Sequence, residues 1–329
     1  IAPVLIPLAV WMVMGAIAHL CGVSPPWIGT GSKLALIPIW FLAVYVVIAL
    51  LVPITHLLWS RFGWYSFFAM AALGGALDIA FFMADLHGLA WLNYVVIWSA
   101  VHQLGYAWHN DQLNGTSRPL WLAAIGGGLL VTLVQWGPYP LSMVSVPGEP
   151  VSNTLPPKVT LLCLGCLQIG LLLSLQSVMK RFLASTKPWA LTVLVNGVIM
   201  TVFLWHMTVM VLFVGAAHLI GDLGLVAEPN SSAWWAQKVV WMLLLTAGLL
   251  PAIGLFGRFE RPKAQLPGLP PLPAWRLILG SLLVCMGLAL VAYGGIAGDG
   301  PLGLRIVALI PPFLGAGLTH RWSRERQPI

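Results

Sequence analysis

The chain is built from apolar runs of about 20 residues, each bounded by a short segment rich in Gly, Pro, Asn or Asp. Runs of that length span the hydrocarbon core of a bilayer, because a helix rises about 1.5 Å per residue. Only 8% of the 329 residues are charged, against about 25% in an ordinary soluble domain. So few charges leave too little polar surface for a soluble protein of this size. We therefore expect an all-α fold, a polytopic membrane helix bundle.

Turn signals divide the chain into about ten expected transmembrane helices. Segments such as "GVSPPWIGTGS", "STKP" and "AQLPGLPPLP" supply the breaks, because Gly and Pro interrupt regular helix. The expected helices cover residues 1–20, 34–57, 64–84, 88–108, 118–136, 158–179, 189–217, 234–256, 275–296 and 303–319.

The 16 Lys and Arg residues are unevenly distributed between alternate connections, with twelve on one face of the membrane and four on the other. The positive-inside rule places the richer face in the cytoplasm, so we expect both chain ends to be cytoplasmic. Any part before Ile1 that also starts in the cytoplasm would then hold an even number of helices. The excess of basic residues that gives the net charge of +7 is therefore explained by their position on the expected cytoplasmic face. We therefore expect the lipid bilayer, and no nucleic acid, as a partner of the basic residues.

A Walker-type loop, G-x-S-x-G and H-E-x-x-H are all missing from the sequence. The pattern G-x-G-x-x-G occurs only as "GDGPLG" at 298–303, in a predicted turn between two apolar runs rather than between a strand and a helix. "CLGC" at 163–166 has the spacing of a metal-binding pair, but no second pair follows it. Because a structural zinc site needs four ligands, we expect these cysteines to pack inside a helix and the protein to bind no metal.

Three polar features lie at membrane depth, where an ionisable side chain costs at least about 2.5–3.5 kcal/mol to insert. The first is His206, in the outer half of the expected helix 189–217, on a polar stripe with Thr192 and Asn196. Two interpretations are open. His206 is a neutral group bonded to a neighbouring helix, or it is a base or binding group, since His suits proton transfer near neutral pH.

The second feature is a cluster in the inner half of the expected helix 88–108. Ser99, His102, Gln103 and Tyr106 fall within an arc of about 100° on one helical face. Four adjacent polar groups are hard to explain as isolated hydrogen bonds in a core. We expect them to line a cavity and to bind substrate.

The third feature is Asp78, in the outer half of the expected helix 64–84. It is the clearest acidic residue at membrane depth, and it needs a partner there. One hypothesis pairs Asp78 with His206, whose ring the carboxylate would orient for catalysis. The other pairs it with a Trp or a Lys elsewhere in the bundle.

The connection 137–157 is long and faces the outside. Five of its 21 residues are Pro, which makes regular helix unfavourable. Its apolar residues predict a loop packed on the bundle, and long structured loops are often functional, although a passive connection is the alternative. Its candidate substrate-binding residues are Tyr139, Ser142, Glu149, Ser152 and Asn153.

Four segments, in this order, resemble motifs of the acyltransferase-3 family of membrane acyltransferases, and two of them resemble an actinobacterial branch of it. They are "WLNYVVIWSAVHQLGYAW" at 91–108, "GPYPLSMVSVPGEPVSN" at 137–153, "MTVFLWHMT" at 200–208 and "FGRFERP" at 256–262. The third resembles the Y-L-W-H segment of that family, with Phe203 in place of the usual Tyr.

The resemblance implies that residues 1–262 are the membrane core of that family without its first two helices. Residues 263–329 would add two further transmembrane helices and a basic cytoplasmic tail. The best-supported catalytic His of the family lies on the first core helix, which would precede Ile1. His206 therefore carries over in a supporting role.

The family implies transfer of an acyl group, often acetyl, from acyl-CoA to a hydroxyl of a cell-envelope glycan or glycolipid at the inner (plasma) membrane. Cytoplasmic basic residues would hold the phosphates of CoA; they are Arg258, Arg261 and Lys263. Two alternatives remain. The protein is a transporter or flippase for an envelope lipid or another small molecule, or it is a non-catalytic subunit held by a membrane protein partner.

Overall fold

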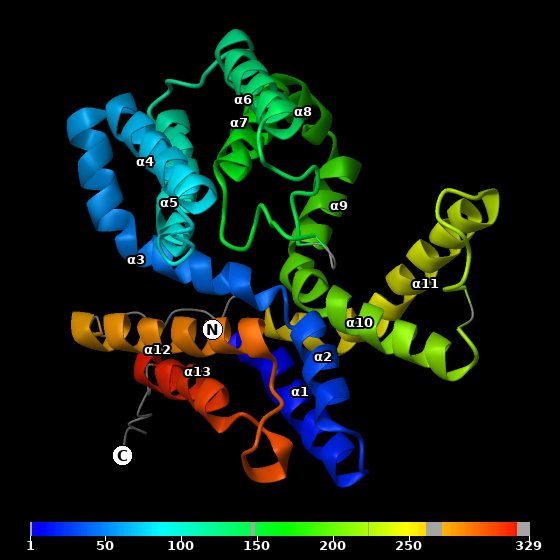
Figure 1. Cartoon of the computed structure of the whole chain (residues 1–329). Coiled ribbons are helices and arrows are strands. Elements are labelled where there is room, and N and C mark those ends of the chain that lie inside the picture. The colour runs from blue at the N-terminus through cyan, green and yellow to red at the C-terminus, as the bar shows by residue number, and fades with distance from the viewer. Residues whose placement is uncertain (1, 146–148, 223, 261–271, 321–329) are drawn as a thin grey trace, which may run out of the picture. The chain divides into compact units, whose positions relative to one another are not determined.

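The computed structural model describes residues 2–145, 149–222, 224–260 and 272–320. These residues form helices joined by turns, and no β-strand occurs among them, only two isolated bridges. The chain divides into two compact units, one made of Ile1–Val46 with Ala190–Ile329 and the other of Val47–Trp189. We call them unit 1 and unit 2 and describe each by itself (Figure 1).

Unit 2 runs from the second half of α3 to the start of α9. Its elements are α3 (Ile39–Phe62), α4 (Trp64–Met83), the 3-10 helix η1 (Leu89–Leu92), α5 (Asn93–His109), α6 (Ser117–Trp136), α7 (Val159–Ser174), α8 (Gln176–Leu183) and α9 (Thr186–Asn196). Unit 1 contains the two ends of the chain. Besides parts of α3 and α9, it holds α1 (Ala2–Leu20), α2 (Pro25–Ala35), α10 (Ile199–Leu219), α11 (Ser232–Phe256), η2 (Gly257–Phe259), α12 (Ala274–Gly294), η3 (Pro301–Gly303) and α13 (Ile306–Thr319).

Six helices of the described chain are long and apolar enough to cross a membrane: α3, α4, α6, α10, α11 with η2, and α12. A seventh span results if α7 and α8, which meet at a 51° bend, are taken together. The apolar parts of α1 and α13 are shorter. The all-helical fold is therefore confirmed, and the apolar helices are consistent with a helical membrane protein, whereas ten spans and two cytoplasmic ends stay predictions.

Two of the predicted boundaries are wrong. The segment around Pro25 and Pro26 forms helix α2 instead of a turn, because Pro is well suited to the first turn of a helix, where its missing N–H is not needed. The single helix expected at 189–217 is broken at Gly197 and Val198 into α9 and α10. The Pro-rich turn at 264–273 lies mostly outside the described residues.

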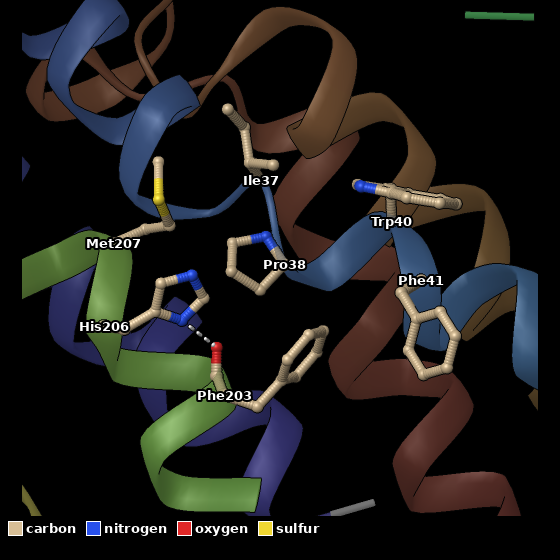
Figure 2. Close-up of a pocket in the computed structure, with 7 residues that line it drawn as sticks. All are labelled: Ile37, Pro38, Trp40, Phe41, Phe203, His206 and Met207. Atoms are coloured by element: carbon tan, nitrogen blue, oxygen red, sulfur yellow. Dashed lines mark hydrogen bonds between the residues drawn. The ribbon is translucent and has the colours of Figure 1, made fainter. Parts of the chain in front are cut away.

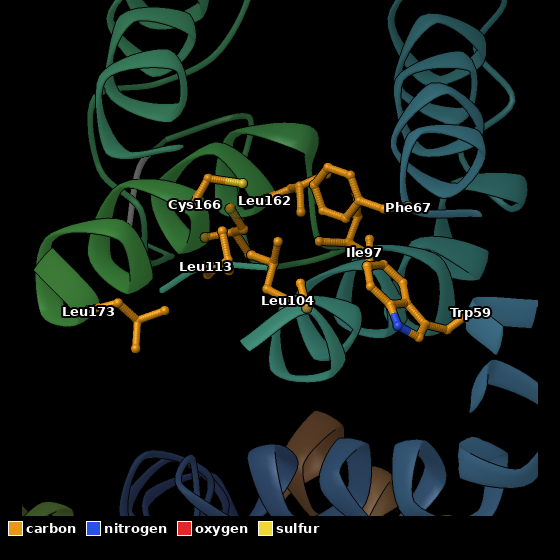
Figure 3. Close-up of a cluster of buried hydrophobic side chains, with 11 residues drawn as sticks. Trp59, Phe67, Ile97, Leu104, Leu113, Leu162, Cys166 and Leu173 are labelled. Atoms are coloured by element: carbon orange, nitrogen blue, oxygen red, sulfur yellow. The ribbon is translucent and has the colours of Figure 1, made fainter. Parts of the chain in front are cut away.

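The core of unit 2 forms where α3, α4, α5 and α7 meet, and Figure 3 shows its side chains. Trp59, Phe67, Ile97, Leu104 and Leu162 are among its buried residues. On α5, the buried core positions follow the three- and four-residue spacing that puts side chains on one face of a helix. That face leaves a neighbouring face of α5 to carry polar groups.

Helix α6 packs closely on α7 through glycine. A Cβ atom added at Gly126 would lie 2.6 Å from the Cβ of Cys166 and 2.8 Å from the carbonyl oxygen of Cys163. At Gly170 on the facing helix, the same atom would lie 2.5 Å from the carbonyl oxygen of Pro119. Small residues let helix backbones approach in this way, which strengthens packing where no hydrophobic effect acts between helices.

In unit 1, α10 packs against α2 and α11, and α1 contacts α2, α10 and α13. Helices α12 and α13 lie side by side as a pair (Figure 1) and also contact α2 and α1 respectively. The two compact units thus divide the chain at points other than residue 262. The predicted division into residues 1–262 and 263–329 is based on the extent of the family resemblance and not on compactness, so it stays a prediction.

The α6–α7 contact predicts opposite effects for two neighbouring glycines. Gly126→Ala should destabilise the protein by about 1–3 kcal/mol, because the added methyl overfills the contact. Gly128→Ala is the matched control, since nothing lies within 4 Å of the added atom. It should be neutral or stabilise by up to about 1 kcal/mol through helix propensity. Thermal unfolding of the detergent-purified proteins measures both, and equal effects would contradict the close packing.

Candidate functional site

His206 lies about two turns into α10, beside a partly open pocket of about 190 Å³ in unit 1 (Figure 2). The walls are otherwise mostly apolar and come from α10, from the turn between α2 and α3 and from the first turn of α3; they are Ile37, Pro38, Trp40, Phe41, Phe203 and Met207. The His206 side chain is exposed rather than buried against another helix. The pocket therefore favours the second interpretation of His206, a binding or proton-accepting group.

The hydrogen bond of the His206 ring fixes which nitrogen is available. Nδ1 lies 2.8 Å from the carbonyl oxygen of Phe203, and a carbonyl only accepts, so Nδ1 carries the proton and donates. In a neutral imidazole the other nitrogen, Nε2, is then an acceptor. Figure 2 shows the ring with this second nitrogen turned away from Phe203. In the neutral ring, Nε2 is thus the nitrogen that can accept a hydrogen bond from a ligand in the pocket.

Phe203 forms part of the pocket wall through its ring. It makes an edge-to-face contact with Phe41 at 5.6 Å between centroids and lies 6.1 Å from the ring of His206. The hydroxyl of the Tyr usual in the resembled motif is missing here, so this side of the pocket is apolar. Phe203 is hydrogen-bonded to His206 through its backbone carbonyl and not through its side chain.

The polar stripe predicted along one helix is not formed. Thr192 and Asn196 lie on α9, and His206 lies on α10 beyond the break at Gly197 and Val198. The prediction that the three residues share one face assumed a continuous helix from 189 to 217, and the break before α10 makes that assumption wrong. Asn196, a candidate substrate-binding residue, is exposed at the end of α9.

Asp78 forms the centre of a second polar site, in unit 2. Its carboxylate accepts hydrogen bonds from the Asn93 amide at 3.0 Å, the Tyr139 hydroxyl at 3.1 Å and the backbone N–H of Val159 at 2.8 Å. The last bond comes from the first turn of α7, where a helix favours negative charge. Asp78 is 0% exposed. Its carboxylate therefore links α4, α5, the 137–157 loop and α7.

Lys158 is the residue of this site that the sequence reasoning missed. It is 0% exposed, and its ammonium group has no hydrogen-bond partner among the described residues. The ammonium lies 3.4 Å from the ring centroid of Phe81, a cation–π contact. Burial lowers the pKa of Lys158, and the nearby charge of Asp78 opposes that shift. The signal in the sequence was a lone Lys in the outer connection, directly before an apolar helix.

The 137–157 loop is fixed to unit 2 at several points. Asn153 is 0% exposed, and its amide donates to the carbonyls of Pro140 at 2.8 Å and Ser142 at 2.9 Å. Its side-chain oxygen accepts from the Thr160 hydroxyl at 2.7 Å. Burial, followed by the charge of Asp78, raises the pKa of Tyr139, so this phenol stays protonated and donates. Asn153 and Tyr139 are thus loop anchors in the structure.

The predicted packing of the loop is correct in part. Met143 packs against the core of unit 2, whereas Leu141 and Val144 are exposed. Glu149 is exposed as well. Ser152 accepts hydrogen bonds from the backbone N–H groups of Thr154 and Leu155 and so shapes the turn. The Ser142 side chain likewise bonds its own segment, at Val144.

The four polar residues of α5 are brought together with α3 and α4. Gln103 is bonded to Ser66 at 2.9 Å, and the Tyr106 hydroxyl lies 3.0 Å from that of Thr55. Three buried atoms of the group have no hydrogen-bond partner among the described residues; they are Ser99 Oγ, His102 Nδ1 and Gln103 Nε2. A buried polar atom without a partner is costly. The predicted role of this face in binding a polar ligand stays a prediction that these atoms support.

The candidate CoA-binding residues lie at a margin of the described chain. Arg258 is exposed in η2, with its guanidinium 4.9 Å from the ring centroid of Phe259. Arg261 and Lys263 lie outside the described residues. Within the residues that the structure describes, no group of three or more His, Cys, Asp or Glu side chains is placed to hold a metal ion.

The hypothesis that pairs Asp78 with His206 stays a prediction, because the two residues belong to different units. Each has bonding partners within its own unit. The alternative, a Lys as the neighbour of Asp78, agrees with the position of Lys158 in the same site.

Comparisons of the chain with protein-family models, with curated proteins and with solved structures find no match. The likeness to the acyltransferase-3 family therefore rests on its motifs in the sequence alone.

The Asp78 site predicts that the two buried charges compensate each other. Asp78→Asn should destabilise the protein by about 3 kcal/mol, because it leaves the Lys158 ammonium buried without a counter-charge. The new amide also faces the Asn93 amide that now donates to Asp78, so Asn93 must turn over for its Oδ1, which has no partner among the described residues, to accept instead. Lys158→Met should also destabilise the protein by leaving a lone carboxylate.

The double variant Asp78→Asn with Lys158→Met provides the control for that prediction. It removes both charges, and a buried ion pair can often be replaced by neutral groups at little cost. Its melting temperature in detergent should therefore lie above those of both single variants. Additive losses in the double variant would show that the two charges do not interact.

Proposed function

We propose that the protein is a membrane-embedded acyltransferase that moves an acyl group, acetyl among the candidates, from acyl-CoA to a hydroxyl of a cell-envelope glycan or glycolipid. The observation that carries the proposal is the His206 pocket, in which Nδ1 is engaged by the Phe203 carbonyl and Nε2 is left as an acceptor. The resemblance of "FLWHMT" to an acyltransferase-3 motif supports the choice of reaction.

In this proposal, His206 has a supporting role on the acceptor side. Nε2 accepts a hydrogen bond from the acceptor hydroxyl and draws off its proton as the oxygen attacks the thioester carbonyl. The carbon–sulfur bond then breaks, and the CoA sulfur leaves as a thiolate that takes up the proton. The apolar walls of the pocket exclude water, so that the thioester reacts with the acceptor rather than being hydrolysed.

The donor is assigned to groups on the cytoplasmic side. Exposed Arg258 provides a planar donor that matches a phosphate of CoA. The α5 polar group is a candidate for holding polar atoms of a substrate, because Ser99 Oγ and His102 Nδ1 are buried without partners among the described residues. The role of Arg258 and the role of the α5 polar group both follow from the resemblance, and the exposure of Arg258 and the unpartnered atoms of α5 support them.

The proposal predicts that His206→Ala lowers acyl transfer by about 100-fold or more, the range of general acid–base catalysis. Membranes that contain the protein are supplied with radiolabelled acetyl-CoA, and label is counted in extracted envelope glycolipid and glycan. His206→Gln should also lose activity, because an amide cannot take up the proton. Thermal unfolding confirms that both variants fold.

The matched control is His218→Ala, near the end of the same helix. His218 is exposed, bonds to Asp222 at 2.5 Å and does not line the pocket. This variant should transfer acyl groups at the wild-type rate. Wild-type activity in His206→Ala would reduce His206 to a packing residue, and a wild-type protein without acetyl transfer would favour the transporter alternative.

A further inference from the structure

Glu260 caps the helix that carries His206. Its carboxylate accepts hydrogen bonds from the backbone N–H groups of Met200, at 3.2 Å, and of Thr201. These are N–H groups of the first turn of α10. The first N–H groups of any helix have no partner within the helix, and a carboxylate is well suited to bind them.

The cap comes from a distant part of the chain. The break at Gly197 and Val198 gives α10 a new N-terminus inside an apolar segment, and Val198 at the N-cap position provides no side-chain bond. Glu260 lies 60 residues further along the chain, directly after η2. The Glu260 carboxylate therefore joins the start of α10 to the segment that follows α11 and η2.

A second contact joins the same two elements one turn further along α10. The rings of Trp205 and Phe256 are stacked, with centroids 4.0 Å apart and an angle of 8° between planes. Trp205 is buried, and Phe256 is the last residue of α11. Thr201 and Trp205 are four residues apart and lie on one face of α10. The Glu260 contact holds the backbone end of the helix and the Trp205 contact holds its side, so together they fix its axial position and its rotation.

Further along the same face of α10, beyond His206 in the sequence, the Trp11 indole donates to the Thr208 hydroxyl at 3.0 Å. His206 lies between these fixed positions and next to Trp205 in the sequence. We propose that Glu260 is a positioning residue for His206: it holds the start of α10 so that Nε2 faces the pocket and Nδ1 stays bonded to Phe203. The part of this inference that concerns acyl transfer rests on the proposed function.

If the cap only stabilises the fold, its removal lowers the melting temperature and leaves the reactivity of the His206 ring unchanged. A positioning role also changes the chemistry of the His206 ring. When the first turn of α10 loosens, the bond from Nδ1 to Phe203 breaks more often, and Nε2 loses part of the basicity that this bond gives it, so the ring reacts more slowly. The chemical reactivity of His206 therefore separates the two roles without relying on enzyme activity.

The experiment measures carbethoxylation of His206 by diethylpyrocarbonate on the detergent-purified full chain, read from the peptide mass spectrum. Glu260→Ala should lower the rate at His206 by about fivefold, the size expected for losing one helix cap, and leave the rate at His218 unchanged. Glu260→Gln keeps one acceptor oxygen and should give an intermediate rate. Exposed Glu228→Ala, before α11, is the acidic control and should match the wild type.

Acetyl transfer by the same variants gives the second readout. Glu260→Ala should lower kcat by about tenfold or more, because small misplacements of a catalytic group are costly, with KM for acetyl-CoA little changed. If Glu260→Ala does not fold, Glu260→Gln decides the question. Unchanged His206 reactivity in the folded variants would overturn the positioning role. A wild type without transfer activity would instead refute the proposed function, while the reactivity at His206 still tests Glu260.

Discussion

Asp78 joins segments that lie far apart in the chain: its carboxylate accepts hydrogen bonds from Asn93 on α5, Tyr139 in the 137–157 loop and Val159 at the start of α7. In an apolar surrounding each of these donors would otherwise be costly, and so would the carboxylate itself. Lys158 supplies the counter-charge from beside Phe81. Much of unit 2 depends on this arrangement, because it sets where the loop meets α7 and how α7 is placed on α4 and α5.

The same constraint explains the two polar regions that the proposed reaction uses. Water does not reach the hydrocarbon core, so every helix break or buried polar group must find a partner in the protein. The backbone N–H groups left free by the break before α10 are bound by the Glu260 carboxylate, and α10 holds His206 beside an apolar pocket. On α5, by contrast, Ser99 and His102 keep buried atoms without partners among the described residues. Such atoms are suited to a polar ligand, and His206 is suited to accept a proton.

The all-helical membrane type was predictable from the sequence, because apolar runs of spanning length and a shortage of charge allow few other folds. Asp78 and the 137–157 loop were predictable as features, since a carboxylate at membrane depth and a long Pro-rich connection are both unusual. The position of Lys158 near Asp78 was not, because the two residues are 80 positions apart in the chain, and helical periodicity reports only neighbours within one helix. The α9–α10 break and the helix at Pro25 were missed because Gly and Pro either end or begin a helix, depending on contacts elsewhere.

The central claim is that buried polar groups hold the 137–157 loop, which the sequence predicts to face the outside, in one fixed conformation on unit 2. Single cysteines introduced by Leu141→Cys and Met143→Cys, in a Cys21→Ser background, test it when intact cells are treated with a membrane-impermeant maleimide. Leu141 is 81% exposed, whereas Met143 packs on the core of unit 2. The account predicts fast labelling at position 141 and protection at position 143 that is lost in Asp78→Asn. Equal labelling of both positions, or no labelling from outside the cell, would contradict it.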